Sequence, residues 1–287
     1  MNSMQRIIKY CAMAVAIMLA VGIITGIVST VFGIVSLIDG NRNASDDQKY
    51  IDSYNTFSDV KSIDVNNSTG ELIIKTGETF RVEAENVTKD FNASVKGNGK
   101  LVIKDKKNVI NVPWFHFSGF QNSKSKITVY LPANFIAENA DINSGAGKVT
   151  IDGLSAGKLK ISAGAGNING SGIKADEVVI DGGVGSIELS GVHFRDTDID
   201  CGVGKLNLDG VLLGDNRIDC GIGQVTLALE GNGEDYSFDI EAGVGSVFLD
   251  GRKISNARHH SSKADNSIKV NGGVGNVMID FSTPSNW

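Results

Sequence analysis

Residues 180–189 read Ile-Asp-Gly-Gly-Val-Gly-Ser-Ile-Glu-Leu, and residues 199–208 read Ile-Asp-Cys-Gly-Val-Gly-Lys-Leu-Asn-Leu. The two stretches share a Gly-x-Gly tripeptide and lie 19 residues apart. The same tripeptide starts at Gly145, Gly164, Gly183, Gly202 and Gly221, always with that step, and again at Gly243 and Gly273. A step this constant indicates an internal repeat.

Aligning the seven units shows which positions face inward. One column is apolar and a second, two residues later, is small. The apolar column holds Ile142, Ile161, Ile180, Ile199, Ile218, Ile240 and Val270, and the small column holds Ser144, Ala163, Gly182, Cys201, Cys220, Ala242 and Gly272. Because the residue between them is polar, this period-2 alternation predicts half-buried strands with both columns inside.

Coils of about 19 residues with glycines at the corners are typical of a β-solenoid. We therefore predict an all-β, single-domain, β-helix-like fold. A further column, Asp141, Lys160, Val179, Asp198, Arg217, Asp239 and Lys269, tests the stacking. If coils stack in chain order, Asp141 lies beside Lys160, and Asp239 lies between Arg217 and Lys269. The extra residues before Gly243 and Gly273 are then expected to be loops leaving the corners.

The N-terminal region predicts a membrane anchor. Residues 11–38 form an apolar run without a charged residue, which is long enough to span a bilayer. Arg6 and Lys9 precede it and acidic residues follow, so residues 1–10 are expected in the cytoplasm and the rest outside the cell. A cleaved signal peptide is the alternative, but the run is long for one. Gly22-x-x-x-Gly26 would allow two anchors to pack closely.

After the anchor we expect a polar linker over residues 39–55 and an extracellular domain over 56–287. Its strands before residue 139 lack the 19-residue regularity and are predicted to cap the solenoid, whereas residues 140–281 form the repeats. The strand Ile63-Asp64-Val65, the Thr69-Gly70 pair, the strand end Leu131-Pro132 and units such as Ile142-Asn143-Ser144-Gly145-Ala146-Gly147 resemble the bacterial putative adhesin family of β-strand repeats. The resemblance implies a surface β-solenoid behind one membrane helix, and it brings no catalytic or ligand residues.

The composition narrows the function further. The formal net charge is -6 and no basic stripe is evident, which argues against nucleic acid. No Gly-Lys-Ser/Thr follows the glycine repeats, so no nucleotide or other cofactor is expected.

A column of acids, Asp181, Asp200, Asp219 and Glu241, is interpreted as a solvated face, with a weak cation site or a glycosidase pair as alternatives. Catalytic residues and a metal site are not predicted.

Cys201 and Cys220 occupy neighbouring rungs of the small column. A disulfide is geometrically allowed there, but parallel side chains disfavour it, so we predict free buried thiols. The insertion 252–266 is basic and contains His259 and His260, which are interpreted as a solvated loop.

One segment is unusually rich in aromatic residues for a surface loop: residues 112–120 read Val-Pro-Trp-Phe-His-Phe-Ser-Gly-Phe. Trp114, Phe115, Phe117 and Phe120 form either a hydrophobic lid over the solenoid end or an exposed binding surface for a glycan, a partner protein or the membrane.

The sequence thus predicts a single-pass cell-membrane protein whose extracellular solenoid binds or scaffolds without catalysis. The expected partners are the membrane, through the N-terminal helix, and an envelope or host-surface glycan or protein. Alternatives are an accessory subunit of an envelope-stress or transport system, and a polysaccharide hydrolase or lyase.

Overall fold

The computed structural model describes residues 50–105, 109–112, 115–118, 125–254, 257–259 and 264–282. The chain divides into two compact units, Met1–Lys49 and Tyr50–Trp287, and the second is described below. The predicted anchor over residues 11–38 lies outside the described residues. Among the residues that are described, no helix is long and apolar enough to cross a membrane.

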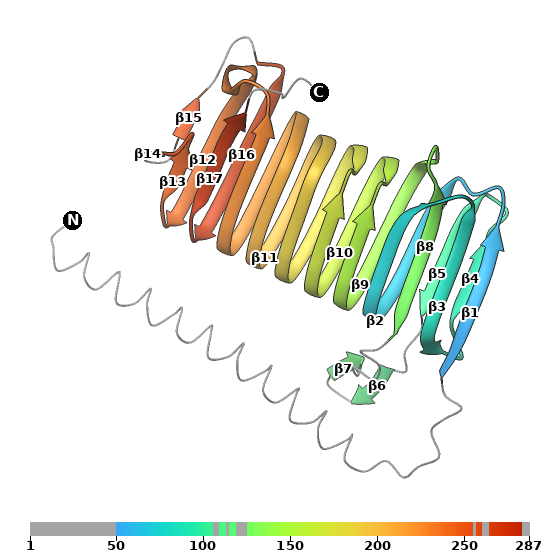
Figure 1. Ribbon diagram of the computed structural model, residues 1–287. Helices are drawn as coiled ribbons and strands as arrows, with labels where there is room; N and C mark the ends of the chain where they lie inside the picture. Colours follow the sequence, from blue (N-terminus) through green and yellow to red (C-terminus); the bar gives the residue numbers. More distant parts are fainter. Residues whose placement is uncertain are drawn as a thin grey trace. The chain divides into compact units, whose positions relative to one another are not determined.

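The second unit is built almost wholly of strands, as the repeat predicts (Figure 1). The repeated coils consist of β2 (Ser62–Gly77), β9 (Ile136–Asp152), β10 (Ser155–Ser171), β11 (Lys174–Glu230), β12 (Tyr236–Val244), β13 (Val247–Leu249), β16 (Asn266–Val274) and β17 (Val277–Ser282). The remaining strands are β1 (Tyr50–Phe57), β3 (Phe80–Thr88), β4 (Asn92–Val95), β5 (Lys100–Asp105), β6 (Val109–Val112), β7 (Phe115–Ser118), β8 (Lys126–Pro132), β14 (Arg252–Ile254) and β15 (Ala257–His259). One short 3-10 helix, η1, spans Gly233–Asp235.

The coils stack in parallel, in the register that the repeat predicts. Ile161 of β10 pairs with Ile142 of β9 on one side and with Ile180 of β11 on the other. All members of the apolar column are buried, and the core lies between the two walls of each coil. The alternation of buried and exposed residues along β11 shows why this segment runs through consecutive coils without a helix.

The corner glycines are required because neighbouring backbones approach closely. A Cβ atom added to Gly183 would collide with the carbonyl oxygen of Gly164 on the preceding coil. At Gly185 the same clash occurs with the carbonyl oxygen of Gly166, and φ is +145°, a conformation that other residues rarely adopt. Each Gly-x-Gly therefore both turns the chain and sets the spacing of the coils.

The stack starts earlier in the chain than the repeat suggests. β2 pairs with β9 from Ile63 to Lys75, and Gly70 lies opposite Gly147. β2 is therefore a coil, although its sequence was expected to belong to an irregular cap. β5 and β8 pair in parallel with the two halves of β2, so together they form the next coil outward. Residues 106–124 connect these two strands where other coils have a glycine corner.

The order of the last coils differs from the chain order. β16 and β17 lie between β11 and the coil made of β12 and β13. Lys269 consequently pairs with Arg217 and with Asp239, so the prediction that Asp239 separates two basic residues is wrong. The sequence could not show this, because the columns are similar in every coil. The expected pairing of Asp141 with Lys160 is confirmed.

This strand order makes a sharp prediction for cross-linking. Paired residues on neighbouring parallel strands lie about 4.8 Å apart, whereas residues two coils apart lie at roughly 9.6 Å, beyond the reach of a disulfide. With Cys11, Cys201 and Cys220 replaced by Ala, we expect copper-catalysed oxidation to cross-link R217C with K269C at least in part, despite the strain that parallel side chains impose, and to leave R217C with D239C reduced. Mass spectrometry of the oxidised protein checks this, and the reverse result would restore the chain order.

Antiparallel strands cover both ends of the stack. At one end β4 pairs with β5, β3 pairs with β8, and β1 pairs with β3. At the other, β14 pairs with β13 and β15 pairs with β12. The insertion 252–266, which was expected to be a loop, therefore contains two short strands. At the other end, residues 50–55 were expected to belong to the linker, but they form part of strand β1. These strands satisfy edges that would otherwise recruit other chains.

Candidate functional site

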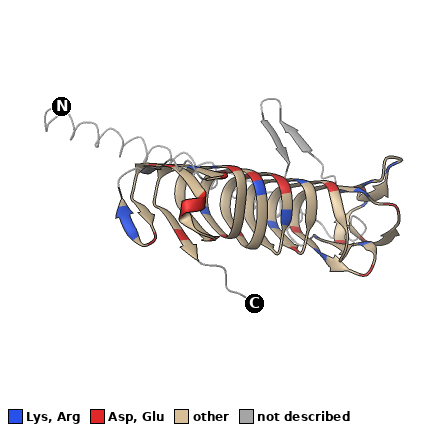
Figure 2. Cartoon of the chain, turned by 90° about the horizontal axis from the view of Figure 1, so that it is seen from above, with Lys and Arg blue, Asp and Glu red and all other residues tan. Residues whose placement is uncertain are grey.

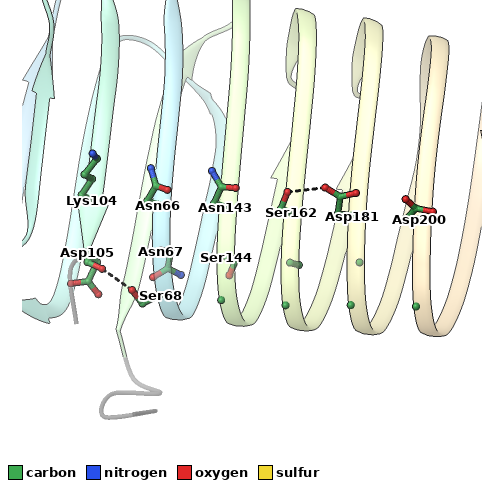
Figure 3. Close-up of a pocket in the computed structure, with 16 residues that line it drawn as sticks. Asn66, Asn67, Ser68, Lys104, Asp105, Asn143, Ser144, Ser162, Asp181 and Asp200 are labelled. Carbon is green, nitrogen blue, oxygen red and sulfur yellow. Dashed lines mark hydrogen bonds between the residues drawn. The ribbon is translucent and has the colours of Figure 1, made fainter. Parts of the chain in front are cut away.

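A row of polar side chains crosses the strands at the first half of the stack (Figure 3). Ser162 lies beside Asn143 on one side and beside Asp181 on the other, and its hydroxyl donates a hydrogen bond of 3.2 Å to Asp181 Oδ2. Asn66 continues the row beside Asn143, and Lys104 follows beside Asn66. We call Lys104, Asn66, Asn143, Ser162, Asp181 and Asp200 the outer row. It offers hydrogen-bonding groups at the regular spacing of parallel strands.

The outer row borders a groove of about 920 Å³ that is open to solvent. The corner glycines Gly145, Gly164, Gly183 and Gly202 also line it. Glycine has no side chain, so the groove can follow the corners across several coils without obstruction. Because the groove is open to solvent, it suits an extended ligand better than a small molecule that must be enclosed.

Beneath the outer row lies a second, buried row, which we call the inner row. It starts with Asp105, Asn67 and Ser144, which pair in register across β5, β2 and β9. Their exposed fractions are only 2%, 2% and 6%, yet all three line the groove. Farther along, the inner row continues with Ala163 and Gly182. The groove therefore has a polar end and an end with a small, apolar floor.

Backbone and side-chain contacts fix the polar end. Asp105 Oδ1 accepts hydrogen bonds from the backbone N–H and the hydroxyl of Thr88, at 3.3 and 2.9 Å. Ser68 donates to the carbonyl oxygen of Asp105 at 3.0 Å. Ser125 Oγ donates to the carbonyl oxygen of Thr69 at 2.7 Å. The coil formed by β5 and β8 is thereby held against the corner of β2.

The predicted acid column is only partly continuous. Asp181, Asp200 and Asp219 follow one another on successive coils, but Asn271 stands between Asp219 and Glu241, because β16 is inserted there. Burial raises the pKa of Asp200, and the charges of Asp198, Asp219 and Asp181 raise it further. Burial also raises the pKa of Asp219, but hydrogen bonds from Asn271 and Arg217 outweigh this and lower it.

These opposite shifts predict opposite effects of substitution. Ionised Asp200 destabilises the fold above its raised pKa, and protonation relieves this as pH falls, whereas ionised Asp219 stabilises the fold until pH falls through its lowered pKa. At neutral pH we expect D200N to raise the melting temperature slightly and D219N to lower it. Both differences should shrink at about pH 3, where unfolded aspartates are protonated. Thermal melts at the two pH values test this, and equal signs would contradict it.

Other predicted sites divide into confirmed and untested ones. Cys201 and Cys220 are buried free thiols, as predicted.

The side chains of Trp114, Phe115, Phe117 and Phe120 lie outside the described part of the structure, so the aromatic surface stays a prediction. The backbone of β6 pairs antiparallel with that of β7. The connecting segment starts directly after Asp105, at the polar end of the groove. His259 and His260 also fall where side chains are not described.

Chemically, the groove combines the hydrogen-bonding groups of the outer row with apolar surface from its glycine and alanine lining. Among the described residues, no group of three or more His, Cys, Asp or Glu side chains could hold a metal ion. Figure 2 shows the charged positions scattered over the described coils, with no continuous basic stripe. The arrangement is therefore suited to recognising a polar ligand by hydrogen bonds.

Sequence reasoning placed Ser144, Ala163 and Gly182 in the inward-facing small column, but it missed the groove and the continuation of this row to Asn67 and Asp105. The signal was present: Asn66-Asn67-Ser68-Thr69-Gly70 aligns with Asn143-Ser144-Gly145-Ala146-Gly147 once a coil is recognised in β2. The alignment was hidden because β2 has Ser68 where the repeats have the first corner glycine. Asp105 could not be found, since its coil is split between two distant segments.

Comparison with solved structures finds similar proteins of low sequence identity. Among solved structures it is similar to a putative cell adhesion protein from Clostridium sporogenes, with 16% identity, 82% of this chain and 100% of that chain covered, and a TM-score of 0.34. It is also similar to a putative adhesin from Bacteroides fragilis, with 14% identity, 81% and 97% covered, and a TM-score of 0.41. A putative lipid binding protein from Parabacteroides distasonis shares 12% identity, with 81% and 97% covered and a TM-score of 0.37.

No curated protein matches the chain. The family model described as Toastrack DUF4097 matches residues 60–280, which include the coils from β2 to β16 and most of β17. The match agrees with the expected resemblance to adhesin-type β-strand repeats. The chain belongs to the Toastrack DUF4097 family.

Proposed function

We propose that this protein is a non-catalytic binding module of the cell surface, held to the membrane through residues 11–38, and that the groove is its ligand site. One observation carries the proposal: the outer row aligns six polar side chains along an open groove, in register, on a rigid stack of coils. Such a surface recognises a long ligand by repeated contacts, as an adhesin must.

The physical argument is one of preorganisation. Each outer-row residue is fixed by backbone pairing on both sides, so little backbone entropy is lost when a ligand binds. Each net hydrogen bond is weak, at about 0.5–1.5 kcal/mol, but several in a line add up and require a ligand that is itself periodic. Envelope and host-surface glycans meet this requirement.

The proposal is tested with the full-length chain in detergent micelles, by measuring its binding to purified cell envelope and to an array of host-surface glycans. We expect N143A with D181A to weaken binding about tenfold or more, a loss of about 1.4 kcal/mol. N207A, an exposed position outside the groove-lining set, is the matched control and should bind normally.

A second variant tests the aromatic segment. If binding survives N143A with D181A but is lost when Trp114, Phe115 and Phe117 are changed to Ser in a folded protein, the ligand site is that segment and the groove assignment is wrong. Absence of binding by the unaltered chain to every envelope and glycan preparation would contradict the proposed function itself.

A further inference from the structure

We infer that two copies of this chain associate end to end, by antiparallel pairing of β1 of one copy with β1 of the other. The contact lies at the end of the stack where the described part of the chain begins. It goes beyond the proposed function, because it supplies a protein partner and does not involve the groove.

Both walls of the stack end, at this side, in a strand with one unused edge. The cap strands pair with the outermost coil, but β1 pairs only with β3, and β4 only with β5, among the strands that the structure describes. The outer edge of each strand carries backbone N–H and C=O groups that pair with no described strand, and such edges are templates for another chain. Figure 1 shows β1 and β4 at the same end of the stack.

The two ends of the stack differ in how their edge strands are protected. At the far end, β14 carries Arg252 and Lys253, and β15 carries Arg258. Positive charges on an edge repel a second copy of the same edge, which is a common way to prevent pairing between chains. In contrast, β4 has no charged residue and β1 has one, Asp52. The end that carries β1 therefore lacks this protection.

The alternation of side chains in β1 defines a core-facing side and an outer side. The core-facing residues are those that pair with apolar residues on the core side of β3. These pairs are Ile51 with Val87, Ser53 with Ala84, Asn55 with Val82 and Phe57 with Phe80. The residues between them, Asp52, Tyr54 and Thr56, are exposed on the outer side.

This pattern is complementary to itself when two β1 strands run antiparallel. Directly opposed residues in such a pair face the same side of the sheet. With the pairing centred on Tyr54, Ile51 of each copy lies opposite Phe57 of the other, so apolar residues meet on the core-facing side. On the outer side the two tyrosines meet, and Asp52 lies opposite Thr56. The two acids are thereby kept apart, so charge does not oppose the contact.

The association also buries apolar surface that is exposed in a single copy. The side chain of Tyr54 is 63% exposed and that of Ile51 is 40% exposed, although both belong to a strand of the main sheet. Burial of their apolar surface stabilises the contact. Backbone hydrogen bonds along the edge add affinity, as in other contacts formed by strand addition.

The position of β1 in the chain favours a second copy as the partner. Residues 39–49 join the predicted anchor to β1 and, fully extended, can reach over roughly 35–40 Å. Two anchors in one membrane would thus hold two β1 strands within reach of each other. Such tethering raises their effective concentration, so a contact of modest area suffices.

The first test measures the mass of the full-length chain in detergent micelles, by light scattering coupled to gel filtration over a range of concentrations. We expect a dimer whose dissociation constant rises at least tenfold in Y54K, because the two introduced lysines would face each other. Within its own copy the introduced lysine would lie opposite Glu83 of β3, so the melting temperature should be retained. N207K adds the same charge at an exposed position of a central coil and should leave the dimer unchanged.

The second test locates the contact by cross-linking, with Cys11, Cys201 and Cys220 replaced by Ala. Under copper-catalysed oxidation we expect Y54C to form a covalent dimer, since opposed residues on antiparallel strands lie within the range of a disulfide. N207C should stay monomeric.

Three results would overturn the inference. The first is a chain that is monomeric at every concentration, the second is a dimer that survives Y54K, and the third is Y54C that cross-links no faster than N207C. Either of the last two would place the association elsewhere in the chain, for example in the anchor. None of them bears on the groove, so binding to envelope and glycans decides the proposed function separately.

Discussion

Replacing Gly185 by Ala should destabilise the protein by about 4 kcal/mol or more, which is exceptional for a single methyl group. The added Cβ would collide with the carbonyl oxygen of Gly166, a backbone atom of the preceding coil that has no freedom to move. The φ of +145° adds strain for any residue with a side chain. Denaturant unfolding followed by circular dichroism measures this loss of unfolding free energy. It is a large part of the 5–15 kcal/mol by which a typical folded protein is stable.

Gly172 provides the matched control. Its φ is +59°, but a Cβ at this position would meet nothing within 4 Å. G172A should therefore cost only the conformational strain, about 1–2 kcal/mol. If G185A costs no more than G172A, the close approach of backbones at the corners is not what requires glycine there.

Replacing Phe194 by Ala should cost about 3–5 kcal/mol. Among the side chains that the structure describes, Phe194 is the largest fully buried one, and its removal leaves a cavity between the two walls of a central coil. The preceding coils carry Ala137, Ala156 and Ala175 at the corresponding rung. A reading of the repeat alone would thus predict that alanine is tolerated, so this substitution separates the repeat pattern from the packing.

The control for this substitution is F194L, which conserves most of the volume and should cost less than about 1.5 kcal/mol. Denaturant unfolding of both variants gives the comparison. Similar small losses for F194A and F194L would mean that the neighbouring coils close the cavity. Because coils contact only their neighbours, the unfolding transition of F194A should also broaden as the stack loses cooperativity at this point.

The groove and the caps illustrate two uses of irregularity in a repeated fold. Coils with complete Gly-x-Gly corners provide a uniform scaffold. Asp105, Asn67 and Ser144 sit where the coil of β5 and β8 lacks such a corner and residues 106–124 are inserted instead. An interrupted coil can carry polar side chains at positions where the regular coils have alanine or glycine.

For the regular repeats, the sequence by itself determined the coil, its glycine corners and which side chains face inward. These depend on alternation within a strand and on glycine at fixed positions, which are properties of neighbouring residues along the chain. Ile142, Ile161 and Ile180 were therefore correctly predicted to be buried, and Cys201 and Cys220 to be free thiols.

Only the tertiary structure decided which coil lies beside which. The columns are nearly interchangeable, so β16 fits between β11 and β12 as well as beyond β12, and no local signal distinguishes the two. In the order found, the coil of β12 and β13 is outermost, and β15 and β14 pair with it at the open end of the stack. Asp105 reached Asn67 and Ser144 because parallel pairing joined segments that are far apart in the chain.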